Sequence, residues 1–297
     1  MHYIFEPGLL SSGPVRTALL VGAIVAITSG IIGVFTVIRG QSFAGHSLAD
    51  VATTGGSGAF LIGLNQFWGF LAAGAAAAAV MEAIGVQRRR GRDVATGVVL
   101  AAALGAAALF LYLGTQQTST TGASFTILFG SIFVITSDTV PVLIASGIVA
   151  LLLVAVLARV LLLTSLSPDL ASARGVNVRL IGAVYLIALA ISVSLSAVAI
   201  GAILSTALLI GPSATALRLT RSPVRAMAAS AVVGVAATWV GIVLAYDSYY
   251  WPPHGRGWPV SFFVVALVLV GYLLTYLRRP RRLVPRSPHE GAECSPA

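Results

Sequence analysis

Apolar residues occur along this chain in runs of about 20, and short polar or arginine-containing segments separate the runs. A run of that length is long enough to cross the hydrocarbon core of a bilayer as an α-helix. The pattern therefore predicts an all-α, polytopic transmembrane helical bundle with nine crossings, or eight if one segment is re-entrant. The predicted crossings cover residues 17–38, 43–64, 67–86, 94–113, 139–163, 179–199, 200–219, 224–246 and 259–277.

The composition agrees with a membrane bundle. Hydrophobic residues make up 58% of the 297 residues, charged residues make up only 9%, and the mean hydropathy is +0.97. Soluble domains carry about 25% charged residues. The apolar runs leave no room for a folded soluble domain, so residues 1–279 are predicted to form a single transmembrane domain. The Pro, Arg and Ser content of residues 280–297 predicts a disordered cytoplasmic tail.

The positions of the basic residues predict which ends of the spans face the cytoplasm. All 18 Lys+Arg residues are arginine, and they give the chain a net charge of +9. Cytoplasmic loops carry an excess of positive charge, so Arg39 and residues 88–92, 174–179, 218–225 and 278–282 are assigned to the cytoplasm. Because the chain has no lysine, it cannot supply the phosphate-binding lysine of a P-loop. Any nucleotide-driven work must therefore come from a partner.

Residues 125–133 are apolar but too short to cross a bilayer. We expect them to lie along the outer interface or to dip into the membrane as a half-helix. The spans themselves are rich in Gly, Ala, Ser and Thr, for example at residues 55–58 and 69–79. Small residues let helix backbones approach closely in lipid, so the helices are predicted to pack tightly.

Two metal-capable side chains, His46 and Asp50, stand within an otherwise apolar region. They are four residues apart, so on a helix they lie on the same face, about 6 Å apart at Cβ. A single divalent cation could bridge them, and ionisable groups among membrane spans usually face a bundle interior or a wet cavity. The alternative interpretation is that residues 42–50 are the polar start of a helix, with Asp50 bonded locally.

A short helix is predicted in the cytoplasmic loop that follows residue 163. Ser167 is a typical N-cap residue, Pro168 favours the first turn, and Asp169 complements the helix dipole. Gly175, directly after Arg174, favours termination. Such a helix could dock a soluble partner, or it could be an ordinary capped connector.

A kink or break is predicted in the stretch of residues 201–216, towards its cytoplasmic half. Pro212 removes one backbone hydrogen bond, and Gly211 loosens the same turn. Broken helices in transporters often border the transport pathway, although a tolerated proline kink is an equal alternative.

Several of these stretches resemble, in the same order, the permease of the metal-ion ABC importers, the ABC-3 family of manganese, zinc and iron chelate uptake. The strongest match is residues 207–216, Ala-Leu-Leu-Ile-Gly-Pro-Ser-Ala-Thr-Ala, which is similar to the family's Ala-Leu-Leu-Ile-x-Pro-Ala-Ala-Thr-Ala. Further matches are Ser42, Phe43, Gly45 and Leu48 of the first-site pattern, Asp93-x-x-Thr96-Gly97, residues 128–131 (Leu-Phe-Gly-Ser), and the coupling loop at residues 168–177. The resemblance covers residues 15–275. Where the family pattern has an acid and then a histidine, this chain has His46 and then Asp50, so both ligand types are kept in exchanged order on one helix face.

The resemblance implies a type II ABC importer-like permease that moves a divalent metal ion by ATP-driven alternating access. The ion would be a transported substrate: manganese or zinc, with iron as a third option. The resemblance implies no permanently bound cofactor and no nucleic-acid partner. The implied partners are cytosolic ABC ATPase subunits, a second permease subunit, an extracytoplasmic metal-binding protein and the lipid of the bacterial inner membrane. His46 and Asp50 would hold the ion, Gly211 and Pro212 would border its pathway, and the short helix would sit in the ATPase cleft through Pro168, Asp169, Ala171, Arg174 and Gly175.

Three other functions are weighed. Residues 55–58 match the Gly-x-Ser-Gly pattern of rhomboid proteases, but the later histidines, His254 and His289, lie in a loop and in the tail, so we expect a transporter subunit and no enzyme. An importer permease for iron–siderophore or cobalamin cargo would not need His46 and Asp50. A proton-coupled carrier is disfavoured because the spans contain so few carboxylates.

Overall fold

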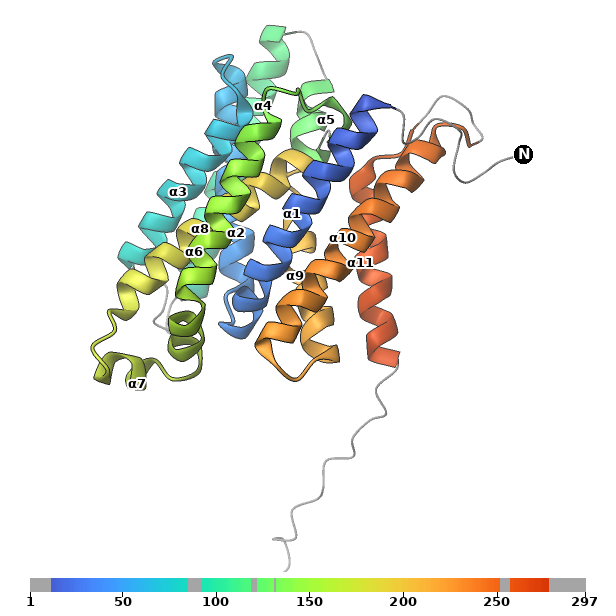
Figure 1. The fold of residues 1–297 in the computed structure, drawn as a ribbon. Coiled ribbons are helices and arrows are strands. Elements are labelled where there is room, and N and C mark those ends of the chain that lie inside the picture. The colour runs from blue at the N-terminus through green and yellow to red at the C-terminus, as the bar shows by residue number, and fades with distance from the viewer. Residues whose placement is uncertain (1–11, 85–91, 119–121, 131, 252–256, 278–297) are drawn as a thin grey trace, which may run out of the picture.

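The computed structural model describes residues 12–84, 92–118, 122–130, 132–251 and 257–277, and every regular element in those ranges is a helix (Figure 1). The elements are α1 (Gly13–Ile38), α2 (Ser42–Leu61), α3 (Gln66–Ile84), α4 (Arg92–Thr118), α5 (Gly122–Phe129), η1 (Ile132–Val134), α6 (Val140–Leu166), α7 (Pro168–Ala173), α8 (Val178–Ile200), α9 (Ser205–Leu219), α10 (Pro223–Ser248) and α11 (Val260–Leu277).

The long helices fall on the stretches that hydropathy predicts. Within the described ranges, the nine helices of 15 residues or more correspond one to one to the nine predicted crossings. Five of these helices are long and apolar enough to cross a membrane by length and composition alone, namely α1, part of α4, α6, α8 and α10. The prediction of an all-α membrane bundle is confirmed. The predicted tail at residues 280–297 lies outside the described residues.

The two ends of the bundle differ in the residues that they carry. Figure 1 places the α1–α2 turn, α7 and the α9–α10 turn at one end, and these segments carry arginines that include Arg39, Arg174 and Arg221. The α2–α3 turn and the segment before α11 lie at the other end, where Trp258 and Asn65 are found. The segments that the arginine pattern assigns to the cytoplasm therefore lie together at one end of the bundle (Figure 1).

Small and hydroxyl-bearing residues hold the central helices together. In α1, Ser29 Oγ lies 2.7 Å from Ser196 Oγ of α8, a buried hydrogen bond between two central helices. Gly55 of α2 and Gly69 of α3 are so close that a Cβ on either would overlap the other's backbone carbonyl oxygen. The predicted close packing at residues 55–58 is therefore confirmed. Within that run Ser57 is buried and its hydroxyl donates to the carbonyl oxygens of Thr53 and Thr54, as a helix-packing serine does.

The predicted half-helix is α5, and its C-terminal end meets an interruption between α8 and α9. The N–H of Ala202 donates to the carbonyl of Ile127 (3.1 Å). Gly130 (φ 79°) and Gly201 (φ 99°) touch at this crossing, where a Cβ on either would overlap the other segment's backbone. Both conformations lie in the region that favours glycine. With 15 residues, α9 is only about 22 Å long, and the end of α5 lies directly against the interruption that precedes it.

The helix break is therefore not where the proline suggested. Although Pro212 cannot donate a backbone hydrogen bond, α9 continues through it from Ser205 to Leu219. The chain breaks instead at residues 201–204, where Gly201 adopts a conformation that no β-carbon-bearing residue adopts readily. A break at Pro212 is therefore wrong in position, because the tertiary contact with α5 decides where the helix ends. The alternative of a kink at Pro212 stays a prediction.

Candidate metal site and coupling helix

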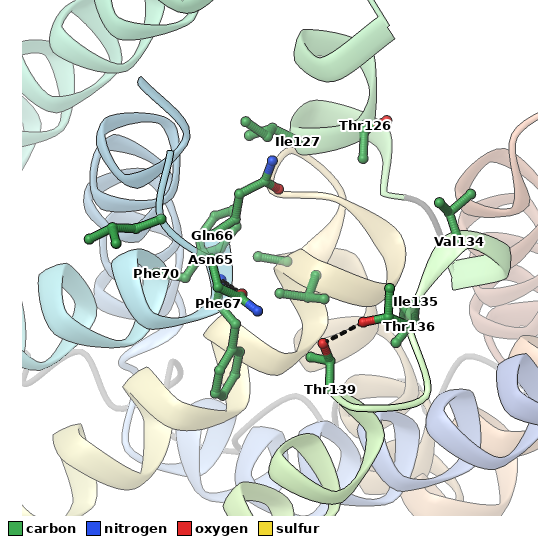
Figure 2. Close-up of a pocket in the computed structure, with 13 residues that line it drawn as sticks. Asn65, Gln66, Phe67, Phe70, Thr126, Ile127, Val134, Ile135, Thr136 and Thr139 are labelled. Carbon is green, nitrogen blue, oxygen red and sulfur yellow. Dashed lines mark hydrogen bonds between the residues drawn. The ribbon is translucent and has the colours of Figure 1, made fainter. Parts of the chain in front are cut away.

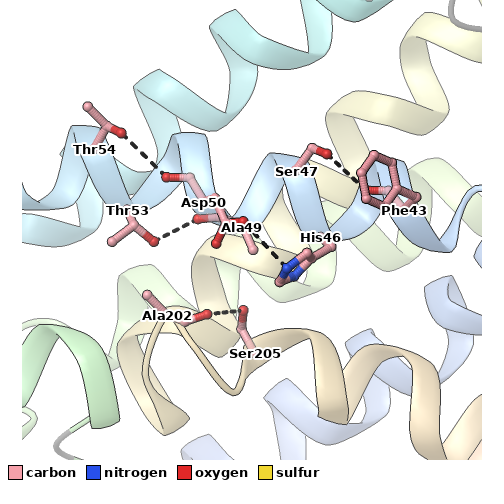
Figure 3. A network of polar contacts seen from close by, with 9 residues as sticks. All are labelled: Phe43, His46, Ser47, Ala49, Asp50, Thr53, Thr54, Ala202 and Ser205. Atoms are coloured by element: carbon pink, nitrogen blue, oxygen red, sulfur yellow. Dashed lines mark hydrogen bonds and ion pairs between the residues drawn. The ribbon is translucent and has the colours of Figure 1, made fainter. Parts of the chain in front are cut away.

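His46 and Asp50 lie on one face of α2, as their spacing predicts. His46 Nε2 is 3.5 Å from Asp50 Oδ2. Figure 3 shows both side chains on the side of α2 that faces the α8–α9 interruption, where Ala202 and Ser205 are drawn. The His46 side chain is 45% exposed and the Asp50 side chain only 8% exposed. One group of the pair is therefore open to its surroundings, and the other is held inside the protein.

The Asp50 carboxylate is poorly satisfied by its neighbours. Its Oδ2 atom is buried and has no hydrogen-bond donor. The nearby hydroxyl groups of α2 are turned to backbone carbonyls instead: Thr53 donates to Ala49 (2.7 Å) and Thr54 to Ala103 of α4 (2.7 Å). A buried polar atom without a partner costs about 1–3 kcal/mol. Among the described residues, the only contact shown for this oxygen is therefore the local one to His46 Nε2 at 3.5 Å. Both the local pairing and a cation site stay open as interpretations of Asp50.

The pair supplies one imidazole nitrogen and carboxylate oxygens, a donor set that suits Mn²⁺, Fe²⁺ and Zn²⁺. Among the residues that the structure describes, no cluster of three or more His, Cys, Asp or Glu side chains could hold a metal. One copy of the chain therefore offers two side-chain ligands, which suits an ion that binds and leaves again better than one that stays.

A pocket of about 270 Å³ opens on the outer side, between the α2–α3 turn, α5 and the start of α6 (Figure 2). Its polar lining is uncharged and includes Gln66, Thr136 and Thr139, the last two joined by a hydrogen bond of 2.9 Å. Its apolar lining includes Phe70 and Ile127. No motif in the sequence signals this pocket, because its walls come from segments far apart in the chain.

Two apolar residues that line this pocket also belong to a buried hydrophobic cluster. Phe70 and Ile127 form a buried cluster with Ala52 of α2 and Ala202 of the α8–α9 interruption. The apolar lining of the outer pocket is therefore continuous with a buried cluster that includes residues of α2 and of the α8–α9 interruption.

The short cytoplasmic helix exists as α7, between α6 and α8. Ser167 is its N-cap residue, as predicted, and the Ser167 side chain makes no capping hydrogen bond. Gly175 follows the helix with φ 77°, as a terminating glycine does. Asp169 and Arg174 are exposed, whereas Ala171 is fully buried. The helix thus rests on the bundle through Ala171 and presents a charged face outward; the side chain of Pro168 lies outside the described residues.

The remaining predicted residues, Gly211 and Pro212, lie in the middle of α9. Pro212 is buried, and Gly211 lies against Val268 of α11, where an added Cβ would overlap the valine side chain. Gly211 therefore serves the packing of α9 against α11. The same helix begins at the interruption that faces the metal pair.

The bundle, the interrupted helix and the exposed cytoplasmic helix define a multi-pass transport subunit of a membrane. The chain belongs to the ABC 3 transport family, whose model matches residues 13–274. It is therefore a transporter membrane subunit and not an enzyme, as the sequence predicts.

Individual relatives agree with this assignment. The chain is 30% identical over 244 residues to the manganese transport system membrane protein MntC of Listeria innocua, covering 82% of this chain and 85% of that protein. It is likewise 30% identical to the manganese import system permease protein ScaB of Streptococcus parasanguinis, with coverages of 82% and 85%. To the high-affinity zinc uptake system membrane protein ZnuB of Haemophilus influenzae it is 25% identical, with coverages of 78% and 88%.

Two solved structures have the same fold. PsaBC from Streptococcus pneumoniae, solved in complex with a Fab, superposes with a TM-score of 0.79 at 24% identity and covers 92% of this chain and 94% of that one. An inward-facing ABC transporter superposes with a TM-score of 0.74 at 13% identity, covering 92% and 88%.

Proposed function

We propose that this chain is the permease subunit of an ATP-binding-cassette importer that moves divalent transition-metal ions into a bacterial cell. The proposed ions are manganese or zinc, with iron as a third option. The manganese names of the two relatives at 30% identity favour manganese as the first cation to test. The ion is cargo, so it binds only in transit.

The observation that carries the proposal is the buried, unsatisfied carboxylate of Asp50 beside the exposed imidazole of His46. A negative charge inside a membrane bundle is costly unless a cation or a donor compensates it. A divalent ion between the two side chains would supply that compensation. The same site on a second permease subunit, or bound water, would supply the remaining ligands.

The energy would come from cytosolic ATPase subunits, because this chain has no lysine for a P-loop. The exposed face of α7, with Asp169 and Arg174, is the proposed contact to those subunits. ATP binding would draw the ATPases together and displace α7, and the attached spans would then change access from one side of the membrane to the other. An extracytoplasmic metal-binding protein would deliver the ion at the outer end.

Gly211 and Pro212 are proposed as a deformable point in α9. The missing N–H of Pro212 leaves the Leu208 carbonyl without its usual helical partner, so the helix can bend there at lower cost. Because α9 begins at the interruption beside the metal pair, bending would change the shape of that side of the pathway.

Uptake by the complete importer in proteoliposomes tests the function. With the ATPase and the metal-binding protein present, we expect Mn²⁺ uptake only when ATP is supplied. Asp50→Asn, which keeps the side chain's size but removes its charge, is expected to lower uptake at least about tenfold. Asp138→Asn is the matched control, because Asp138 is exposed in the turn before α6.

Two results would contradict the proposal. One is metal uptake that proceeds equally well without nucleotide. The other is transport of an iron–siderophore or cobalamin that survives Asp50→Asn while Mn²⁺ and Zn²⁺ are not transported, since a large chelate does not need the His46–Asp50 pair.

A further inference from the structure

Arg39, the residue that follows α1, touches both helices that carry α7. Its Nη1 donates to Thr164 Oγ1 (3.2 Å) in the last turn of α6, directly before α7. Its guanidinium carbon lies 5.0 Å from the ring centroid of Tyr185 in α8, the helix after α7. One side chain therefore connects the end of α1 to the helices on both sides of the cytoplasmic helix.

The same side chain also reaches the start of α2. Arg39 Nε donates to Gln41 Oε1 (3.3 Å), and the backbone carbonyl of Gln41 accepts the N–H of Gly45 (3.0 Å) in the first turn of α2. Gln41 is buried. His46 is the next residue after Gly45, so few bonds separate Arg39 from the first member of the metal pair.

The surroundings of Arg39 are polar, charged and enclosed. The Tyr185 hydroxyl is buried and lies 2.7 Å from Thr36 Oγ1 in α1, which fixes the ring beneath the guanidinium. Burial lowers the pKa of Arg39 from its ordinary value, while the neighbouring Tyr185 and Glu82 act in the opposite direction. An arginine nonetheless stays protonated in proteins, so this junction of four helices contains a permanent charge that must move with its partners.

We propose that Arg39 is a positioning residue that transmits the displacement of α7 to the N-terminal half of α2, and so to His46 and Asp50. The proposal rests on the function proposed above. Its physical basis is a planar guanidinium whose Nε and Nη1 bonds point to different helices, a geometry that an ammonium group cannot reproduce. Motion of α6 and α8 around α7 would pull on Arg39, and Arg39 would move Gln41 and the first turn of α2.

A second arginine–tyrosine pair provides the matched control. Arg218 in α9 lies 5.2 Å over the ring of Tyr272 in α11 and donates from Nη1 to its hydroxyl (3.0 Å). The pair resembles Arg39–Tyr185 in chemistry, but neither of its helices leads directly into α7. A merely structural role of such a pair would give the two arginines the same phenotype.

The test measures Mn²⁺ uptake and ATP hydrolysis separately in the complete importer in proteoliposomes. Arg39→Gln is expected to lower the number of ions moved per ATP at least about fivefold, the lower end of typical coupling factors. Equilibrium Mn²⁺ binding to the nucleotide-free complex should remain unchanged, because Arg39 does not contact the ion. Arg39→Lys should restore part of the ratio, and Arg218→Gln should leave it unchanged.

An unchanged ratio for Arg39→Gln overturns the inference, and so does an equal loss for Arg39→Gln and Arg218→Gln. If Arg39→Gln does not assemble, Thr164→Val removes the hydroxyl that accepts from Arg39, together with its own bond to the Leu161 carbonyl within α6. An unchanged ratio in that variant overturns the inference as well. Failure of the wild-type importer to move Mn²⁺ or Zn²⁺ with ATP would remove the proposed function and this inference together. Normal wild-type transport with an unchanged variant ratio would remove the inference alone.

Discussion

Two polar side chains, Arg39 and Asp50, lie near the N-terminal half of α2, and they differ in how many hydrogen bonds they make. Around Arg39, the guanidinium donates to Gln41 and Thr164, and the Tyr185 hydroxyl pairs with Thr36. Around Asp50, the buried Oδ2 atom has no hydrogen-bond donor, and His46 Nε2 lies 3.5 Å from it. Arg39 is suited to hold the helices in a fixed arrangement, because each of its hydrogen bonds restricts the movement of one helix relative to another. Asp50 is suited to receive an ion, because no hydrogen bond occupies its Oδ2 atom.

The comparison predicts the largest effects at the metal pair. Replacing either His46 or Asp50 by alanine should lower Mn²⁺ uptake about 100-fold, since even outer-shell partners of a metal are worth 10- to 100-fold. The double variant His46→Asp with Asp50→His keeps both ligand types on one helical face, so it should transport better than either alanine variant. Initial rates of Mn²⁺ uptake in proteoliposomes would decide this. Equal loss in the exchanged and alanine variants would mean that the face of α2 does not define the site.

A smaller effect is expected on the free energy of unfolding, and its sign should differ between a substitution beside Arg39 and one at Asp50. Tyr185→Phe removes the hydrogen bond to Thr36 but keeps the ring beneath Arg39, so it should lower the free energy of unfolding by about 1 kcal/mol. Thr36 retains its bond to the Ile32 carbonyl, which limits the loss. Asp50→Asn should leave stability equal or higher, because it removes a buried charge. The thermal midpoints of the detergent-solubilised permease without metal measure both, and destabilisation by Asp50→Asn would show that the carboxylate is part of the packing.

Much of the fold is predictable because hydropathy and helix-terminal residues act locally. The nine long helices follow from apolar runs, and α7 follows from Pro168 and Gly175, whose backbone preferences do not depend on distant contacts. The shared face of His46 and Asp50 follows from helical periodicity alone.

The rest depends on contacts between distant segments. The break at residues 201–204 is set by the crossing of Gly201 with Gly130, which the sequence does not reveal, and Pro212 pointed to the wrong turn. From the sequence alone, Arg39 indicates only which end of the first span faces the cytoplasm. Its bond to Thr164 spans 125 positions in the chain, so its connecting role becomes visible only when α6 and α8 are in place.

In the proposed function, His46 and Asp50 bind the transported ion directly. Pulsed electron paramagnetic resonance of Mn²⁺ bound to the nucleotide-free importer measures this, because a coordinating histidine nitrogen couples to the electron spin. With ¹⁵N-histidine in the permease alone, we predict a ¹⁵N coupling that disappears in His46→Ala, and weaker Mn²⁺ binding in Asp50→Asn. A histidine coupling that persists in His46→Ala, or Mn²⁺ binding that Asp50→Asn leaves unchanged, would contradict the account.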